Sequence, residues 1–119
     1  MFGEDFKLQN DDEILAINSP KSSCCGPYIV VSKSLESRWA IVALDWEGTS
    51  TLGIRWFDRS IGIPNSRGRA TWFAIPHELH NAVLNGLPLD FQFRDRVNQF
   101  LDREISGDQL KTYAQTNKI

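Results

Sequence analysis

The pattern of apolar residues in the first half of the chain predicts β-strands. The segments 28–32 (YIVVS) and 38–46 (RWAIVALDW) are rich in the β-branched and aromatic residues that favour strands. In 38–46 both alternating sets are mostly apolar, one being Ala40, Val42, Leu44 and Trp46 and the other Trp39, Ile41 and Ala43. We therefore expect 38–46 to be a central strand that is covered on both faces.

A hairpin should follow this central strand. The residues 47–50 (EGTS) form the expected turn, and alternation in the next strand, 51–57, divides its side chains between two faces. The face expected to meet the main core holds Leu52, Ile54 and Trp56, and the other face holds Gly53, Arg55 and Phe57. The segment 58–68 is longer than a tight hairpin, so we expect a mobile or partner-ordered loop there and a further strand at 69–75.

The chain before these strands is polar and less regular. Residues 1–12 form an acidic lead-in with isolated aromatic residues, which is either frayed or held to the body by its rings. The segment 13–17 (EILAI) predicts a short strand. The segment 21–27 (KSSCCGP) is a loop by composition, because its Gly-Pro pair is typical of turns.

The last part of the chain has helical periodicity. The segment 76–84 predicts a short helix with proline in its first turn. A second helix is expected to begin after Asp90, because aspartate favours the N-cap position. Its apolar stripe consists of Phe93, Val97, Phe100 and Leu101. Ser106 and Gln109 have the spacing of a capping box for a last short helix.

These elements predict a single α+β domain over residues 1–119. We expect an antiparallel meander of about four to five strands, followed by about two to three C-terminal helices that pack on one of its faces. A length of 119 residues and a hydrophobic content of 41% are sufficient for one core without disulfide or metal cross-links.

The overall charge and the apolar runs narrow the functional classes. The net charge is −2 and the pI is near 5.6, which argues against a general polyanion binder, so any nucleic-acid contact would be local. No apolar run approaches the roughly 18 residues of a membrane span, and the acidic N-terminus differs from a signal peptide. The adjacent Cys24 and Cys25 cannot easily form an unstrained disulfide, so they predict free thiols and a cytoplasmic location.

The candidate site lies in 53–76, where arginines and Trp-Phe pairs flank a glycine-containing loop. Between Arg55 and Phe73 four arginines accompany one aspartate, a local charge of +3 that leaves −5 for the rest of the chain. The candidate binding residues are Arg55, Phe57, Arg59, Arg67, Arg69 and Trp72. On one face they would resemble a protein hot spot or a stacking platform for bases. Alternatively, the aromatic rings are core residues and the arginines pair with carboxylates of the same chain.

Two other groups of residues could carry chemistry. His77 and His80 share a helix face, but a zinc-protease helix needs histidines four apart and a third ligand. Cys24 and Cys25 could supply a nucleophile, yet they precede a predicted strand and lack the helix N-terminus that lowers a thiol pKa. Phosphate-loop and dinucleotide-binding motifs are missing. We therefore predict no catalytic residue, no metal site and no cofactor.

Three functions remain open at this point. The leading prediction is a small non-enzymatic interaction module that binds a protein partner, either another protein or a second copy in a homodimer. The first alternative is a local nucleic-acid binder that uses the same residues, which the acidic pI disfavours. The second is a small enzyme or ligand-binding domain that uses the histidines or cysteines in a cleft. No membrane partner is expected.

Overall fold

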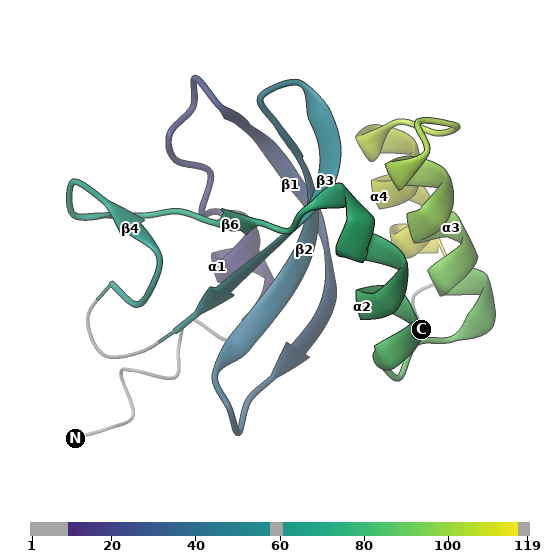
Figure 1. The fold of residues 1–119 in the computed structure, drawn as a ribbon, viewed down its shortest axis with the longest axis horizontal. Helices are drawn as coiled ribbons and strands as arrows, with labels where there is room; N and C mark the ends of the chain where they lie inside the picture. The colour runs from purple at the N-terminus through teal and green to yellow at the C-terminus, as the bar shows by residue number, and fades with distance from the viewer. Residues whose placement is uncertain (1–9, 58–60, 117–119) are drawn as a thin grey trace.

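The structure, a computed structural model, describes residues 10–57 and 61–116 of the chain. Four antiparallel strands form a sheet in the order β1-β2-β3-β6, and C-terminal helices contact this sheet, which confirms the predicted α+β fold (Figure 1). A second, two-stranded sheet is the β4-β5 hairpin. The elements are α1 (Asp11–Leu15), β1 (Cys24–Ser34), β2 (Trp39–Trp46), β3 (Thr49–Trp56), β4 (Asn65–Ser66), β5 (Arg69–Ala70), β6 (Phe73–Ala74), η2 (His77–Leu79), α2 (His80–Gly86), α3 (Phe91–Leu101) and α4 (Gly107–Thr116).

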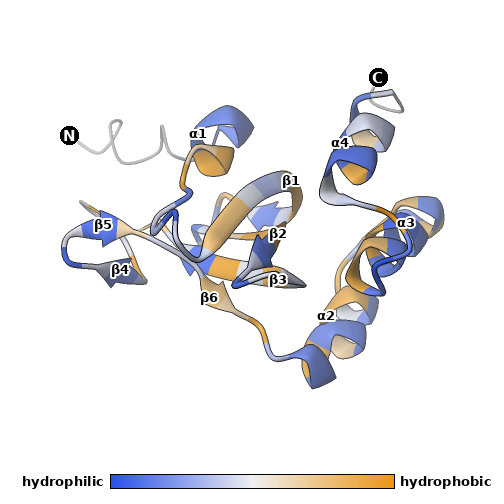
Figure 2. Ribbon diagram, turned by 90° about the horizontal axis from the view of Figure 1, so that it is seen from above, coloured by the Kyte–Doolittle hydropathy of each residue, from blue (hydrophilic) through white to orange (hydrophobic). Residues whose placement is uncertain are grey.

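β2 is the central strand, as predicted, and its two faces belong to two separate cores. It pairs with β1 on one side and with β3 on the other. Ile41 and Ala43 lie in the core under the C-terminal helices, whereas Val42 and Leu44 lie in the core under α1. Figure 2 looks along the sheet and shows α1 on one side of the strands and α2, α3 and α4 on the other. The strand is therefore covered on both faces.

The β2-β3 hairpin has a turn of two residues. Glu47 and Gly48 both have positive φ angles, 52° and 83°, which match the right-handed twist of the flanking strands. β3 therefore begins at Thr49, two residues earlier than predicted. The predicted division of 51–57 between two faces is confirmed at two buried positions. Leu52 on β3 belongs to the core under the C-terminal helices, and Phe57, directly after β3, belongs to the core under α1.

The C-terminal helices follow their sequence signals. The Asp90 carboxylate caps α3, because it accepts hydrogen bonds from the backbone N–H groups of Gln92 (3.1 Å) and Phe93 (3.2 Å). Ser106 and Gln109 form the predicted capping box of α4. The buried residues of α3 are Val97, Phe100 and Leu101. Among the described residues, no helix has the length and apolar character needed to cross a membrane.

The structure corrects three predicted elements. Residues 13–17 overlap the helix α1, because Asn10 accepts a hydrogen bond from the N–H of Asp12 and acidic residues fill the first turn. Strand β1 begins at Cys24, within the expected loop. The expected strand 69–75 is divided, because β5 pairs with β4 whereas β6 pairs with β3.

The expected loop 58–68 contains regular pairing in its described part. Residues 58–60, which include the candidate site residue Arg59, lie outside the described residues. Ile63 forms a β-bridge with Trp56, and β4 begins at Asn65. The segment from 61 onwards is therefore neither a helix nor a single open loop. Whether a partner orders it stays a prediction.

Candidate interaction surface

Arg55 is fully buried, so it does not form the exposed face that the sequence led us to consider. Its guanidinium donates hydrogen bonds to the backbone carbonyl oxygens of Ile61, Pro64 and Thr71, and the distance from Nη1 to the Pro64 oxygen is 2.9 Å. Burial lowers the pKa of Arg55 to about 10, so the side chain is still a cation at neutral pH. The carbonyl acceptors replace the water that this cation loses. Arg55 therefore fixes the backbone between 61 and 71.

Phe57 and Trp72 also belong to the interior. Both lie in the core under α1, with exposed fractions of 1% and 3%. The indole Nε1 of Trp72 donates a hydrogen bond to the carbonyl of Ile17, at 2.8 Å. Gly53 allows this close packing, because a Cβ at this position would lie only 3.2 Å from the Cβ of Trp72. The core alternative therefore holds for both rings.

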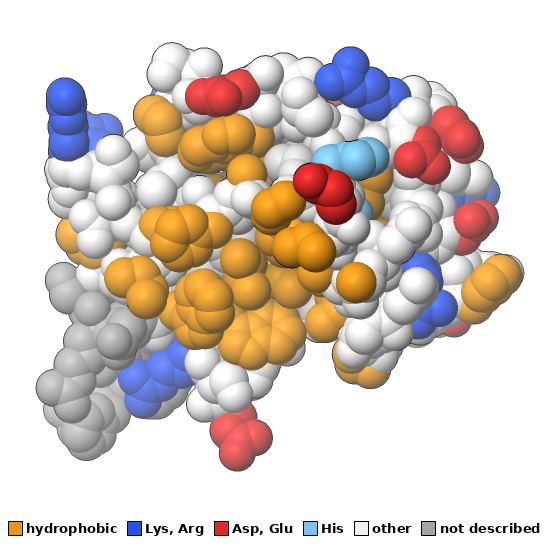
Figure 3. Space-filling model, viewed as in Figure 1, with side chains coloured by type: hydrophobic (Ala, Val, Ile, Leu, Met, Phe, Trp, Pro, Cys, Tyr) orange, Lys and Arg blue, Asp and Glu red, His pale blue; other side chains and the backbone are white. Residues whose placement is uncertain are grey.

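The exposed apolar side chains of this region are Trp56, Ile63 and Phe73, with exposed fractions of 37%, 52% and 50%. Trp56 forms a β-bridge with Ile63, and Phe73 pairs with Ile54. Directly opposite residues of antiparallel strands share a face, and Ile54 and Trp56, two residues apart on β3, also share a face. The exposed side chains of Trp56, Ile63 and Phe73 therefore lie on one face of the sheet. We call Trp56, Ile63 and Phe73 the β6-edge patch. Figure 3 shows hydrophobic side chains gathered in the middle of the face that Figure 1 presents.

The helices that pack on the sheet leave this patch uncovered. Along one face of β3, exposure rises from the fully buried Leu52, through the partly buried Ile54, to Trp56 at the end of the strand. β6 has two residues and pairs only with Gly53 and Ile54 of β3. The expectation that Trp56 faces the main core was therefore wrong, because the sheet extends beyond the helices that cover it.

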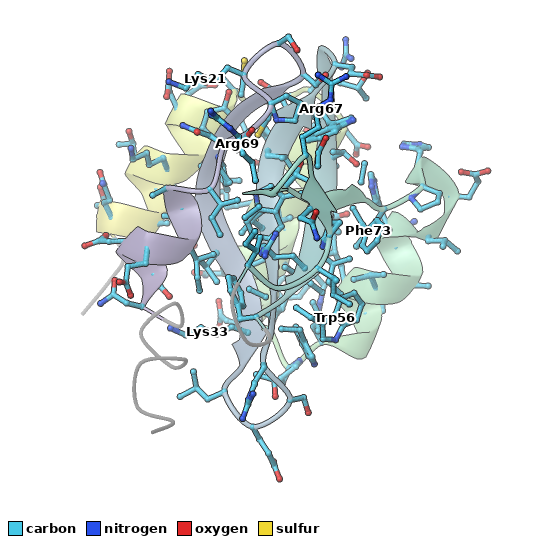
Figure 4. The ribbon with its side chains drawn as sticks, turned by 90° about the vertical axis from the view of Figure 1, so that its left-hand side faces the viewer. Lys21, Lys33, Trp56, Arg67, Arg69 and Phe73 are labelled. Carbon is cyan, nitrogen blue, oxygen red and sulfur yellow. The ribbon has the colours of Figure 1, made fainter. Side chains whose placement is uncertain are left out.

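Arg67 and Arg69 are exposed on the β4-β5 hairpin. Arg67 and Gly68 form its turn, with positive φ angles of 53° and 81°. Within residues 10–57 and 61–116, neither arginine forms an ion pair with a carboxylate. The view in Figure 4 has Arg67, Arg69 and Lys21 towards the top and Phe73 and Trp56 on the right. The hairpin lies between Ile63 and Phe73 along the chain, so its exposed arginines add positive charge at one end of the region that holds the apolar patch.

His80 has a buried, structural environment. Its Nε2 atom lies 3.0 Å from the carbonyl oxygen of Ile75 and 3.1 Å from Oγ1 of Thr51, so a proton on Nε2 can be donated to Ile75. Burial lowers the pKa of His80, which favours the neutral ring. His77 contacts it edge to face, with 5.4 Å between ring centroids. In the part of the chain that the structure describes, no group of three His, Cys, Asp or Glu side chains could hold a metal ion.

The two cysteines are free thiols in different environments. Cys24 is buried and Cys25 is exposed. Burial, with a smaller contribution from Cys25, raises the pKa of Cys24 to about 11, so this thiol is protonated at neutral pH. A protonated thiol is a poor nucleophile. Cys24 lies on β1 and His80 beside β6, at the two edges of the sheet, so the structure does not bring them into one site.

No protein-family model, curated protein or solved structure gives a significant match to this chain. Similarity therefore assigns no role to any residue. The β6-edge patch and the exposed Arg67 and Arg69 are the surface features from which a function can be inferred.

Proposed function

We propose that this chain is a non-enzymatic protein-interaction module that binds a partner protein through the β6-edge patch. The observation that carries the proposal is the joint exposure of Trp56, Ile63 and Phe73 where the helices no longer cover the sheet. Aromatic side chains contribute strongly to binding when a partner excludes water from them. Contiguous apolar surface on a small protein is often functional for the same reason.

The charges beside the patch define the chemistry of the partner. Arg67 and Arg69 are exposed cations without a described counterion, and arginine recognises carboxylates through paired hydrogen bonds. We therefore propose a partner surface with an apolar centre and an acidic margin. A second copy of the chain would bring its own arginines to a two-fold interface, where like charges oppose each other. The homodimer is thus the less favoured form of this proposal.

The buried Arg55 supports the proposal because it holds the patch in one conformation. Its guanidinium binds the carbonyls of Ile61 and Pro64, which lie on either side of Ile63. It also binds the carbonyl of Thr71, two residues before Phe73. A surface that is ordered before binding loses less conformational entropy when the partner arrives.

We also propose that the protein is cytoplasmic and that it is not an enzyme. The free thiols of Cys24 and Cys25 suit a reducing compartment. The side chains considered for chemistry have roles in the fold, since His80 is hydrogen-bonded to Ile75 and Cys24 is buried and protonated. These environments support an interaction module over a small enzyme.

Site-specific photo-cross-linking in cells that express the chain tests this function. A benzophenone amino acid replaces Phe73 in the patch, and in a matched control it replaces Phe91, which lies on α3 and is 76% exposed. We expect position 73, but not position 91, to cross-link to a discrete protein. A cross-link from position 73 to a second copy of the chain would show that the surface forms a homodimer and does not bind a different protein. Equal products from both positions would contradict the proposal.

A labelled single-stranded oligonucleotide separates protein binding from nucleic-acid binding. At roughly physiological salt we expect no change in its fluorescence anisotropy, because binding to a phosphate backbone needs several basic contacts. Binding that weakens steeply with salt and is lost when Arg67 and Arg69 become alanine would favour the nucleic-acid alternative instead.

A further inference from the structure

β1 is the edge of the sheet opposite the β6-edge patch. The strand order is β1-β2-β3-β6, and among the described residues β1 pairs only with β2. An edge strand directs unpaired N–H and C=O groups outwards, where another strand can pair with them. β1 has 11 residues and β6 has two, so β1 offers much the longer edge.

Two helices enclose this edge and form a groove. α1 contacts β1 from one face of the sheet and α4 contacts it from the other. Figure 2 shows β1 at the edge of the sheet, between α1 and α4. The groove has a volume of about 560 Å³ and is lined by residues 27–30 of β1, by Asp12 and Leu15 of α1, and by Lys111 and Ala114 of α4.

We propose that this groove binds one extended segment of a partner protein, which pairs with β1 as an additional strand of the sheet. In such a strand alternate side chains would point to opposite faces, so one set would meet α1 and the other α4. Pairing begins after Pro27, which has no N–H group to donate. The register shift between Val30 and Ser32 ends the regular stretch, so the contact is short.

The charges of the two walls define the segment that fits. On the α1 wall, Asp11 already pairs with Lys33, with 2.7 Å between Oδ1 and Nζ. Asp12 on the same wall forms no ion pair with any described cation, so side chains that face α1 should be basic. On the α4 wall, Ala114 lies beside Lys111, so side chains that face α4 should be apolar and not basic.

A second copy of this chain fits the groove less well than a single peptide. Two β1 strands paired across a two-fold axis would place the same face of both sheets on one side, and thus the two α1 helices next to each other. Each α1 carries Asp11, Asp12 and Glu13 in its first turn, so like charges would oppose this dimer. A partner that inserts one strand avoids the repulsion.

Synthetic peptides test the groove separately from the β6-edge patch. The probe is a fluorescein-labelled peptide of about six residues that alternates lysine and valine, and the control peptide has glutamate in place of lysine. We expect the anisotropy to report binding of the lysine peptide and about tenfold weaker binding of the glutamate peptide. Asp12→Lys should weaken the lysine peptide about fivefold. Glu13→Lys, the same charge change outside the groove lining, should have less than about a twofold effect.

Backbone pairing is tested by two further measurements. A lysine-valine peptide that is N-methylated at every residue has no backbone N–H group to donate to a strand edge and should not bind. The unmodified peptide should slow amide exchange in 28–31. The Phe73→Ser variant should bind the unmodified lysine-valine peptide with wild-type affinity, because Phe73 lies outside the groove. This result would separate the groove from the proposed function of the β6-edge patch. Equal binding of the lysine and glutamate peptides, no binding of either, equal effects of Asp12→Lys and Glu13→Lys, or slowed exchange only outside β1 would overturn the proposal.

Discussion

Arg55 connects the core under α1 with the segment that presents the candidate surface. Its Cζ atom lies 5.1 Å from the centroid of the Phe57 ring, and its guanidinium binds backbone carbonyls on both sides of Ile63. Strand alternation correctly placed Arg55 and Phe57 on one face. Burial of the arginine could not be predicted from the sequence. It depends on the irregular segment 61–71 folding over the Arg55 side chain, where its backbone carbonyls need hydrogen-bond donors.

Replacement of Arg55 by methionine tests this role. The change keeps an unbranched side chain but leaves the carbonyls of Ile61, Pro64 and Thr71 without their donor. Each unsatisfied buried acceptor costs about 1 to 3 kcal/mol, so the free energy of unfolding in urea should fall by about 3 kcal/mol or more. The exposed Arg69→Met should change it by less than about 0.5 kcal/mol. A loss below about 1 kcal/mol for Arg55→Met would show that the segment does not depend on this residue.

His80 should make stability depend on pH. Burial lowers its pKa in the folded protein below the ordinary value of 6.5. As the pH falls below about 6.5, the unfolded chain therefore gains a proton that the folded protein does not, and the free energy of unfolding decreases by up to about 1.4 kcal/mol per pH unit until the folded pKa is reached. In urea titrations from about pH 7.5 to about pH 5, His80→Gln should reduce this decrease and His77→Gln should not. The same decrease in wild type and His80→Gln would contradict the assignment.

Among the elements, long periodic segments were predictable and short ones were not. The apolar stripe and the Asp90 cap identify α3, which has 11 residues. α1 has five residues, and over that length an apolar run is compatible with either a strand or a helix. Asn10 followed by three acidic residues was the available helix signal. The division of 69–75 into β5 and β6 depends on pairing with different strands, which local sequence does not encode.

Gly107 determines how closely α4 approaches the sheet. A Cβ at this position would lie 2.1 Å from a ring carbon of Tyr28. That ring is held by the hydrogen bond from its hydroxyl to Asp45 (2.8 Å) and by an edge contact with Phe100. Gly107→Ala should therefore lower the free energy of unfolding by about 1 to 3 kcal/mol. In Gly86→Ala the new methyl group would meet no atom within 4 Å apart from the adjacent residues and the backbone of its own helix, so this variant should be neutral or slightly stabilising. Equal losses in both variants would contradict this packing.

In the whole molecule, the two proposed surfaces lie at opposite edges of one sheet, and the two cores share β2. Loss of either core would expose the apolar face of β2 that this core covers. We therefore predict that the chain unfolds as one cooperative unit, as expected for a single domain. Urea transitions followed by far-UV circular dichroism and by tryptophan fluorescence should coincide. Separate midpoints would show that the cores are independent.

The sequence located the region of the candidate surface but not its members. The segment 53–76 contains all three residues of the β6-edge patch, and its charge and aromatic content drew attention to it. Exposure of Trp56 and burial of Trp72 could not be predicted, because both depend on where the helices end over the sheet and on the space above Gly53. That Arg67 and Arg69 contact a partner stays a prediction.

The central claim is that Trp56, Ile63 and Phe73 bind a partner protein. The most direct test is to purify the partner that cross-linking identifies and to measure its affinity for the wild-type chain and for variants. Phe73→Ser should weaken binding about thirtyfold, equivalent to about 2 kcal/mol, while the Tm of the chain stays close to that of wild type. Phe91→Ser should leave both quantities unchanged, because Phe91 lies on α3 outside the patch. Wild-type affinity in Phe73→Ser, or equal losses in the two variants, would contradict the account.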